Sequence, residues 1–346
     1  MDEPTLHQLL KKALEYRASD VHFKVGQPPA FRVDGDLRYL QGDKLRAEQT
    51  QRISEIIVAR ARYKGAIEDL LEFDCSYSAP GCGRYRVNVY KQRGTLAVAM
   101  RLIPLDIPTY EMLGAPSICS TFAQAERGMV LVVGAAGNGK SSTLAAIIGE
   151  VNRTRRVHVV TIEDPIEFMH TDQLATISQR EVGLDTGNFA NALRGSLRQD
   201  PDVILVGEIR DAETMDIALK AAETGHLVFS TLHTPDVQRT VGRILALAGD
   251  QPPEEVRERF ADNLRGIIAQ RLLPNAAGRG LVLAAEVLYA TGTVKDAIKR
   301  PSHNPPLKDL MEKGVHPYNM QTFEMAMRDL VKAGKLTVEV ARQALA

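Results

Sequence analysis

The stretch from Gly128 to Asn152 constrains this chain of 346 residues more than any other. A valine-rich run, 129–133, has the length of a strand, and a helix-forming segment begins at Ser142. Between them stands G-x-x-x-x-G-K-S, which in a strand–loop–helix context is typical of a phosphate-binding P-loop. A glycine-rich turn that only connects strand to helix is the alternative. We favour the P-loop because motif and context occur together.

Each part of this loop has an expected role in binding ATP and Mg²⁺. The glycines let backbone N–H groups turn inward on phosphate, and the helix N-terminus adds partial positive charge. Lys140 is expected to contact the β- and γ-phosphates, and the Ser141 hydroxyl to ligate Mg²⁺. The predicted nucleotide-binding residues are Gly134, Ala135, Ala136, Gly137, Asn138, Gly139, Lys140, Ser141 and Ser142.

Composition limits the compartment and the partners. Lys plus Arg equals Asp plus Glu at 43 each, so no net charge attracts nucleic acid or an anionic membrane. The three cysteines lack zinc-site spacing, and their odd count suits a reducing compartment. The N-terminus has no apolar signal-peptide region, and no apolar run approaches the ~20 residues that span a bilayer. We predict a cytoplasmic protein without membrane insertion or direct nucleic-acid binding.

The first hundred residues predict a small α+β domain over 1–104. The expected elements are a helix over 6–14, strands over 21–25, 30–33, 84–90 and 95–103, and a helix over 47–71 interrupted near Gly65. Strict alternation places Arg84 and Arg86 on one strand face and Tyr85 on the other. A linker is predicted over 105–112, because Pro104 and Pro108 stiffen the chain there.

Strands and helices then alternate over 113–290, which predicts an α/β domain with an open parallel sheet. The expected strands are 129–133, 157–162, 203–206 and 227–230. Apolar spacing over 254–273 predicts a helix. The remainder, 291–346, is predicted to be a helical region interrupted by the prolines of 301–306.

Acids and imidazoles lie where predicted strands end. Glu163 and Glu208 follow two strands at the carboxyl edge, where open α/β sheets bind ligands. Glu163 suits a water-polarising base, and capping of a strand or helix is its alternative role. The apolar run before Glu208 resembles the second nucleotide-binding motif of P-loop enzymes, with glycine where aspartate is usual. His226 and His233 flank one strand, and either can contact a γ-phosphate or be an ordinary surface or core histidine.

Together these stretches resemble the secretion-ATPase superfamily of type II secretion and type IV pili, most closely the PilT-like pilus retraction ATPases. The resemblance is carried, in order, by Ala18–His22, Arg32–Gly35, Arg84–Asn88, the P-loop, Thr161–Glu167, Gln179–Gly183, Phe189–Leu193, Leu197–Pro201, Val206–Asp211, Ala222–His226 and Thr231–His233.

The resemblance implies a PAS-like N-terminal domain, a RecA-like P-loop domain and a homohexameric ring with ATP between domains and subunits. By analogy Glu163 is the catalytic glutamate, Glu208 supports Mg²⁺ through water, and His226 and His233 form the family's His box. The N-terminal arginines Arg84, Arg86 and Arg101 match residues that reach the nucleotide, and a solvated sheet face is their alternative role. The implied partner is an inner-membrane pilus platform protein.

Two departures from the family pattern bear on function. The P-loop reads GAAGNGKSS where the family usually has GPTGSGKST, but its glycines, lysine and hydroxyl remain. The family's AIRNLIRE-like helix corresponds to 294–310, where Pro301, Pro305 and Pro306 prevent one regular helix. The expected function is ATP hydrolysis by a hexameric motor that retracts type IV pili. Alternatives are an accessory or paralogous ATPase, a RecA-like nucleic-acid motor, and an ATP-gated assembly protein without turnover.

Overall fold

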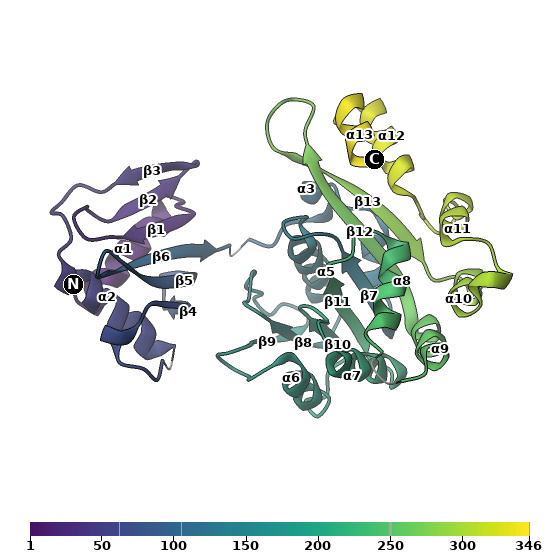
Figure 1. The fold of residues 1–346 in the computed structure, drawn as a ribbon, viewed down its shortest axis with the longest axis horizontal. Coiled ribbons are helices and arrows are strands. Elements are labelled where there is room, and N and C mark those ends of the chain that lie inside the picture. Colours follow the sequence, from purple (N-terminus) through teal and green to yellow (C-terminus); the bar gives the residue numbers. More distant parts are fainter. Residues whose placement is uncertain (62, 105, 249–250, 346) are drawn as a thin grey trace. The chain divides into compact units, whose positions relative to one another are not determined.

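The structure is a computed structural model that describes residues 1–61, 63–104, 106–248 and 251–345. The chain divides into two compact units, residues 1–105 and 106–346, each with its own sheet (Figure 1). The predicted fold class, an α/β P-loop domain preceded by a small α+β domain, is confirmed.

The first unit is a fully antiparallel six-stranded sheet with strand order β3-β2-β1-β6-β5-β4. Its elements are α1 (Glu3–Glu15), β1 (Asp20–Phe23), β2 (Ala30–Val33), β3 (Asp36–Tyr39), α2 (Ala47–Arg60), the 3-10 helix η1 (Ile67–Asp69), β4 (Glu72–Ala79), β5 (Gly83–Gln92) and β6 (Thr95–Ile103). Strands β3 and β4 were not predicted. The expected helix over 47–71 ends earlier, at Arg60.

The two faces of this first sheet differ as the alternation in β5 predicted. Tyr85, Val87 and Val89 are fully buried in a core shared with α1 and α2. Arg86 lies on the opposite, exposed face and is paired in register with Arg101 of β6. The sheet therefore buries one face and presents arginines on the other.

The second unit is a seven-stranded sheet with order β13-β12-β7-β11-β10-β8-β9, parallel except for β13. Its elements up to β13 are α3 (Tyr110–Leu113), α4 (Ile118–Ala123), β7 (Gly128–Val133), α5 (Lys140–Thr154), β8 (His158–Glu163), β9 (Thr176–Glu181), α6 (Phe189–Ser196), β10 (Val203–Val206), α7 (Ala212–Glu223), β11 (Leu227–Leu232), α8 (Val237–Ala246), α9 (Pro253–Asn263), β12 (Leu264–Pro274) and β13 (Leu281–Tyr289).

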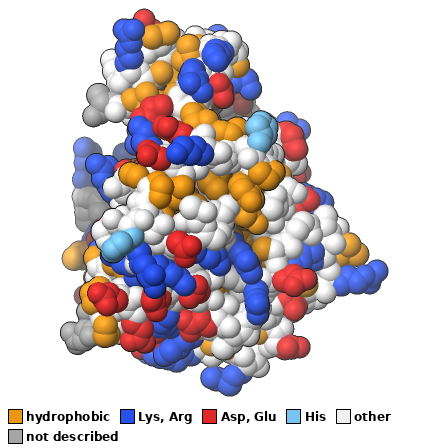
Figure 2. Space-filling view, turned by 90° about the vertical axis from the view of Figure 1, so that its right-hand side faces the viewer, with side chains coloured by type: hydrophobic (Ala, Val, Ile, Leu, Met, Phe, Trp, Pro, Cys, Tyr) orange, Lys and Arg blue, Asp and Glu red, His pale blue; other side chains and the backbone are white. Residues whose placement is uncertain are grey.

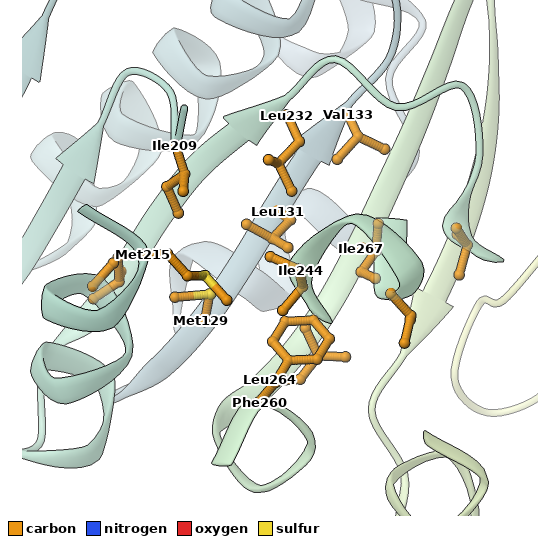
Figure 3. Packing of buried hydrophobic residues seen from close by; sticks show 14 of the residues in the cluster. Met129, Leu131, Val133, Ile209, Met215, Leu232, Ile244, Phe260, Leu264 and Ile267 are labelled. Carbon is orange, nitrogen blue, oxygen red and sulfur yellow. The ribbon is translucent and has the colours of Figure 1, made fainter. Parts of the chain in front are cut away.

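Helices cover both faces of this second sheet. Val130 and Val132 of β7 pack toward α4 and α5, whereas Met129 and Leu131 pack toward α6–α9. Figure 3 shows the second of these cores, where Met129, Leu131 and Phe260 lie together between the central strands and the helices. Because β7 is buried on both faces, its sequence is a continuous apolar run rather than an alternating one.

The predicted helix over 254–273 is wrong beyond residue 263. Only its first part is α9, and the rest is the central strand β12, followed by the unpredicted β13. A strand buried on both faces gives an apolar run that also fits helical spacing. The strand in turn requires glycine at position 266, because an added Cβ would lie 2.1 Å from Cζ of Phe122 and 2.7 Å from the Leu288 carbonyl oxygen.

The C-terminal residues are helical and interrupted where the prolines predicted. The elements are α10 (Gly292–Lys299), the 3-10 helix η2 (Pro301–His303), α11 (Leu307–Lys313), α12 (Phe323–Lys332) and α13 (Val338–Leu345). The helix α10 ends before Pro301, and α11 begins directly after Pro306. The stretch 294–310 thus contains parts of two helices joined by a 3-10 turn.

Two further properties of the fold are the apolar length of its helices and the charge on its surface. Within the described residues, no helix has both the length and the apolar character that crossing a bilayer requires. Figure 2 shows acidic and basic side chains interspersed on the visible face, without a large field of one sign.

Candidate active site

Four neighbouring strands, β7, β11, β10 and β8, end at one edge of the second sheet, and the segments that follow them enclose a pocket of about 260 Å³. Its lining residues are Ala136, Gly137, Lys140, Ser141, Leu144, Ala145, Glu163, Asp164, Pro165, Glu167, Phe168, His170, Phe189, Leu205, Gly207, Glu208, Thr231 and His233. The structure thereby brings together Lys140, Ser141, Glu163, Glu208 and His233, as the sequence predicted.

The P-loop has the backbone conformation that its glycines permit. Gly137 and Gly139 adopt φ angles of 78° and 76°, in the left-handed region, and space around a Cβ built on Gly137 is open. The Lys140 Nζ lies 2.8 Å from the Gly134 carbonyl oxygen and 3.0 Å from that of Ala135. Burial lowers the pKa of Lys140, while Glu208 and Glu167 act in the opposite direction. The ammonium is therefore held by the loop itself.

Strand β12 supports the P-loop from behind. The Asn138 Oδ1 accepts a hydrogen bond of 2.9 Å from the backbone N–H of Leu272. Gln270, which is fully buried, donates from Nε2 to the Thr143 hydroxyl at 2.7 Å. Gly134 must be a glycine here, because its φ is 147° and an added Cβ would lie 2.6 Å from the Gln270 carbonyl oxygen. One hydrogen bond therefore joins β12 to the loop at Asn138, a second joins it to Thr143 of α5, and the backbone of Gly134 passes close to the same strand.

Glu163 ends β8 with two donors on one carboxylate oxygen. The Thr161 hydroxyl donates to Oε1 at 2.6 Å, and the Gln179 Nε2 donates to the same oxygen at 3.1 Å. Burial raises the pKa of Glu163, and these two hydrogen bonds oppose the rise. The carboxylate is therefore oriented and faces a pocket that holds the P-loop lysine.

Glu208 follows β10 in a small ionic cluster. Its Oε1 pairs with Arg210, its Oε2 lies 3.2 Å from Nε2 of His233, and Arg210 Nη1 lies 3.7 Å from Oδ2 of Asp164. Side-chain exposure of Glu208 is only 13%. Arg210 thus joins the segments that follow β8 and β10, a role that the sequence analysis did not assign.

The structure does not bring His226 into this pocket. His226 precedes β11, so it lies at the opposite end of the strand from His233. Its Nδ1 contacts the Ala221 carbonyl oxygen at 2.9 Å and the Thr224 hydroxyl at 3.2 Å. Direct contact with a phosphate in the same chain's pocket is not supported for this histidine, because a six-residue strand separates the two positions.

The predicted arginines lie in the first unit, on the exposed sheet face. Arg101 Nε pairs with the Asp20 carboxylate at 2.9 Å, and Arg84 Nη1 donates to the Ser78 hydroxyl at 3.4 Å. Arg86 and Arg101 line a shallow depression of about 190 Å³ together with Asp20. Arg86 and Arg101 are exposed, whereas Arg84 is only partly exposed and its Nε is buried.

Sequence reasoning also missed His170 and Gln179. His170 lines the pocket, its Nδ1 is buried, and burial lowers its pKa to about 4. Gln179 contacts Glu163 from the edge strand β9. Both lie in or beside stretches that carried the family resemblance, but residue type alone indicates no role for either.

The donor set fits a nucleoside triphosphate with Mg²⁺. The exposed Ala135, Ala136 and Gly137 leave the loop backbone open to a phosphate, and Lys140 supplies a positive charge. In the part of the chain that the structure describes, no cluster of three or more His, Cys, Asp or Glu side chains can hold a metal. Ser141 and Glu208 suit Mg²⁺, which typically keeps several waters and uses substrate phosphates as ligands.

Comparison with known proteins assigns the family. Residues 97–305 match the model of the type II/IV secretion system protein family. The chain belongs to that family. This family member is 38% identical over 336 residues to the type IV pilus retractation ATPase PilT of Pseudomonas aeruginosa, covering 97% of this chain and 96% of the relative. It is also 38% identical to the type IV pilus ATPase PilU of the same organism, over 96% of this chain and 87% of PilU.

The fold of this family member is similar to that of a solved relative. A crystal structure of the pilus retraction motor PilT with bound ADP matches with a TM-score of 0.86 and 39% identity, covering 98% of this chain and 96% of that one. The chain is thus a PilT-like member of the secretion and pilus ATPases throughout its length. The chain is 38% identical to both PilT and PilU, so sequence identity does not distinguish a PilT-like from a PilU-like role.

Proposed function

We propose that this protein is a cytoplasmic, Mg²⁺-dependent ATPase that retracts type IV pili as a hexameric motor. The observation that carries the ATPase assignment is the meeting of Lys140, Glu163 and Glu208 in one pocket at the carboxyl edge of the sheet. A cationic loop and two carboxylates are what phosphoryl transfer to water requires.

Five residues of the pocket have a part in the proposed reaction. Lys140 and the loop N–H groups would hold the phosphates, and Ser141 and Glu208 would hold the metal, Glu208 through water. Bound Mg²⁺ supplies neutralisation of charge on the phosphate oxygens. Glu163 accepts a hydrogen bond from the attacking water and aligns it. His233, in contact with Glu208, links the metal side of the pocket to the end of β11.

The mechanical part of the proposal rests on the relatives. PilT is described as a retraction ATPase and a retraction motor, and this chain matches nearly the full length of both. We propose that six chains form a ring in which Arg84, Arg86 and Arg101 reach the nucleotide. The sheet face that carries these arginines would then face the nucleotide. His226 lies outside the pocket of its own chain and would act at a contact between chains of the ring. The partner is a pilus platform protein at the inner membrane.

An accessory or paralogous ATPase is the second candidate function. It is favoured by the break between α10 and α11 and by the equal identity to PilU. Restoring this gene to a strain that lacks it and following fluorescent pili separates the two functions. Retraction that needs a second ATPase supports the accessory role. Turnover stimulated by DNA or RNA would instead support a nucleic-acid motor.

The catalytic assignment is tested by Glu163→Gln. Loss of the base is expected to lower kcat by about 10²-fold or more while ATP binding remains, because general-base catalysis contributes on that order. Phosphate release gives kcat, and a fluorescent ATP analogue gives the dissociation constant. Glu126→Gln, at an exposed glutamate of the same unit, is the matched control. Near-wild-type turnover in Glu163→Gln would refute the assignment.

A further inference from the structure

Gln179 lies beside Glu163 because of the register of two strands. Strands β8 and β9 pair Thr161 with Gln179, and Glu163 is two residues beyond Thr161 on the same face of β8. Thr161 and Gln179 therefore donate to the same atom, Oε1 of Glu163, at 2.6 and 3.1 Å. A neighbouring strand thus supplies one of the two side-chain donors to this oxygen.

The remaining hydrogen bonds of Gln179 fix the orientation of its amide. Nε2 also donates to the Phe168 carbonyl oxygen at 2.9 Å, and Oε1 accepts from the backbone N–H of His170 at 2.8 Å. A flipped amide would set its NH₂ group against the His170 N–H and its oxygen against two acceptors. The donor is therefore held toward Glu163.

The amide opposes the effect of burial on Glu163. A carboxylate in a half-buried pocket is favoured in its charged form when donors contact it. The charged or titratable groups that line the same pocket are Lys140, Asp164, Glu167, His170, Glu208 and His233. Among these, Glu167 adds negative charge near Glu163, which increases the need for a neutral donor.

We propose that Gln179 is a positioning residue for ATP hydrolysis, which holds the Glu163 carboxylate charged and oriented toward the attacking water. This role rests on the proposed function of Glu163. It differs from a structural role, in which Gln179 only ties the segment 164–170 to β9 through Phe168 and His170.

Two substitutions separate these roles. Gln179→Glu keeps the length of the side chain and the acceptor for His170 but removes the donor to Glu163 and adds a negative charge. Gln179→Leu removes donor and acceptor together. Both are expected to lower kcat about tenfold, the lower end for a hydrogen bond to a charged group, with the ATP dissociation constant within about twofold. The acid limb of the kcat–pH profile should move up by about one pH unit.

The deciding measurement combines these variants with Glu163→Gln. A residue that acts through Glu163 loses its effect when that carboxylate is absent, so Gln179→Leu should lower kcat less than about twofold in that background. Gln173→Leu, at an exposed glutamine of the same unit, is the control. If Gln179→Leu loses its far-UV circular dichroism signal and so does not fold, Gln179→Glu replaces it in the same comparison with and without Glu163→Gln.

The outcomes distinguish the two proposals. Equal loss of kcat in both backgrounds, or a rise in KM with unchanged kcat and pH profile, would make Gln179 a structural residue and overturn the inference. If Glu163→Gln lowers kcat but neither Gln179 variant does, only the role of Gln179 fails. If Glu163→Gln itself turns over normally, the role of Glu163 fails, and that of Gln179 with it.

Discussion

Replacement of His170 is expected to change how stability depends on pH. The Nδ1 of His170 is buried without a hydrogen-bond partner among the described residues, and burial lowers the pKa to about 4 from an ordinary value near 6.5. As pH falls, the unfolded chain therefore takes up this proton before the folded one does. Stability is present in full above about pH 6.5 and is lost as pH falls toward 4.

The magnitude follows from these two pKa values. Near pH 5 the unfolded state gains about 2 kcal/mol from protonation of this histidine, whereas near pH 7 it gains about 0.2 kcal/mol. Leucine cannot be protonated, so His170→Leu lacks this contribution to the loss of stability at low pH. The difference in unfolding free energy between pH 7 and pH 5 should therefore be about 2 kcal/mol smaller in the variant than in the wild type.

Urea unfolding followed by far-UV circular dichroism measures this difference at both pH values. His303→Leu, at an exposed histidine of the same unit, is the control and should keep the wild-type dependence on pH. An equal loss of stability between pH 7 and pH 5 in the wild type and in His170→Leu would refute the reasoning. It would mean that His170 titrates alike in the folded and unfolded chains.

Three further predictions concern the strand β12 and the pH profile. Gly266→Ala should destabilise the second unit by about 3 kcal/mol, because its Cβ would meet the Phe122 ring, whereas Gly242→Ala in α8, with open space around its Cβ, should not lower the melting temperature. Asn138→Ala should lower the unfolding free energy by about 1–2 kcal/mol through loss of the acceptor for Leu272, and unchanged urea unfolding would contradict this. Since burial raises the pKa of Glu163 and the carboxylate must be charged to align water, kcat should fall with decreasing pH above the ordinary glutamate range. An acid limb at or below pH 4.5 would argue against this.

Local sequence patterns predicted the part of the site that lies at the carboxyl ends of the parallel strands. The P-loop, Glu163 and Glu208 each follow a short apolar run, and parallel strands bring their carboxyl ends to one edge whatever their order. The pocket could therefore be predicted without knowing which strands are neighbours. The sequence pattern did not separate His226 from His233. Strand β11 lies between them and places His226 at the opposite edge of the sheet.

Two features could not be predicted because they depend on partners distant in sequence. The apolar residues of β12 fit a helix and a buried strand equally well, and only contact with β7 and with the Phe122 ring decides between them. Gln179 lies on β9, a polar edge strand without a hydrophobic pattern, and the β8–β9 register gives it its role. Residue type and spacing carry no information about register between such strands.

The placement of β12 gives the P-loop a mechanical connection to the end of the chain. At Leu272 the strand donates to Asn138 of the loop. One residue earlier, the Arg271 guanidinium donates to the Ala344 carbonyl oxygen of α13 and lies 4.1 Å from the centre of the Phe323 ring of α12. Adjacent residues of one extended strand, which resists stretching, thus hold the phosphate loop on one side and the last two helices on the other. A displacement of the loop can reach α12 and α13 along this strand without passing through Pro301–Pro306. In the proposed motor, the broken helix therefore need not lie on the path of force.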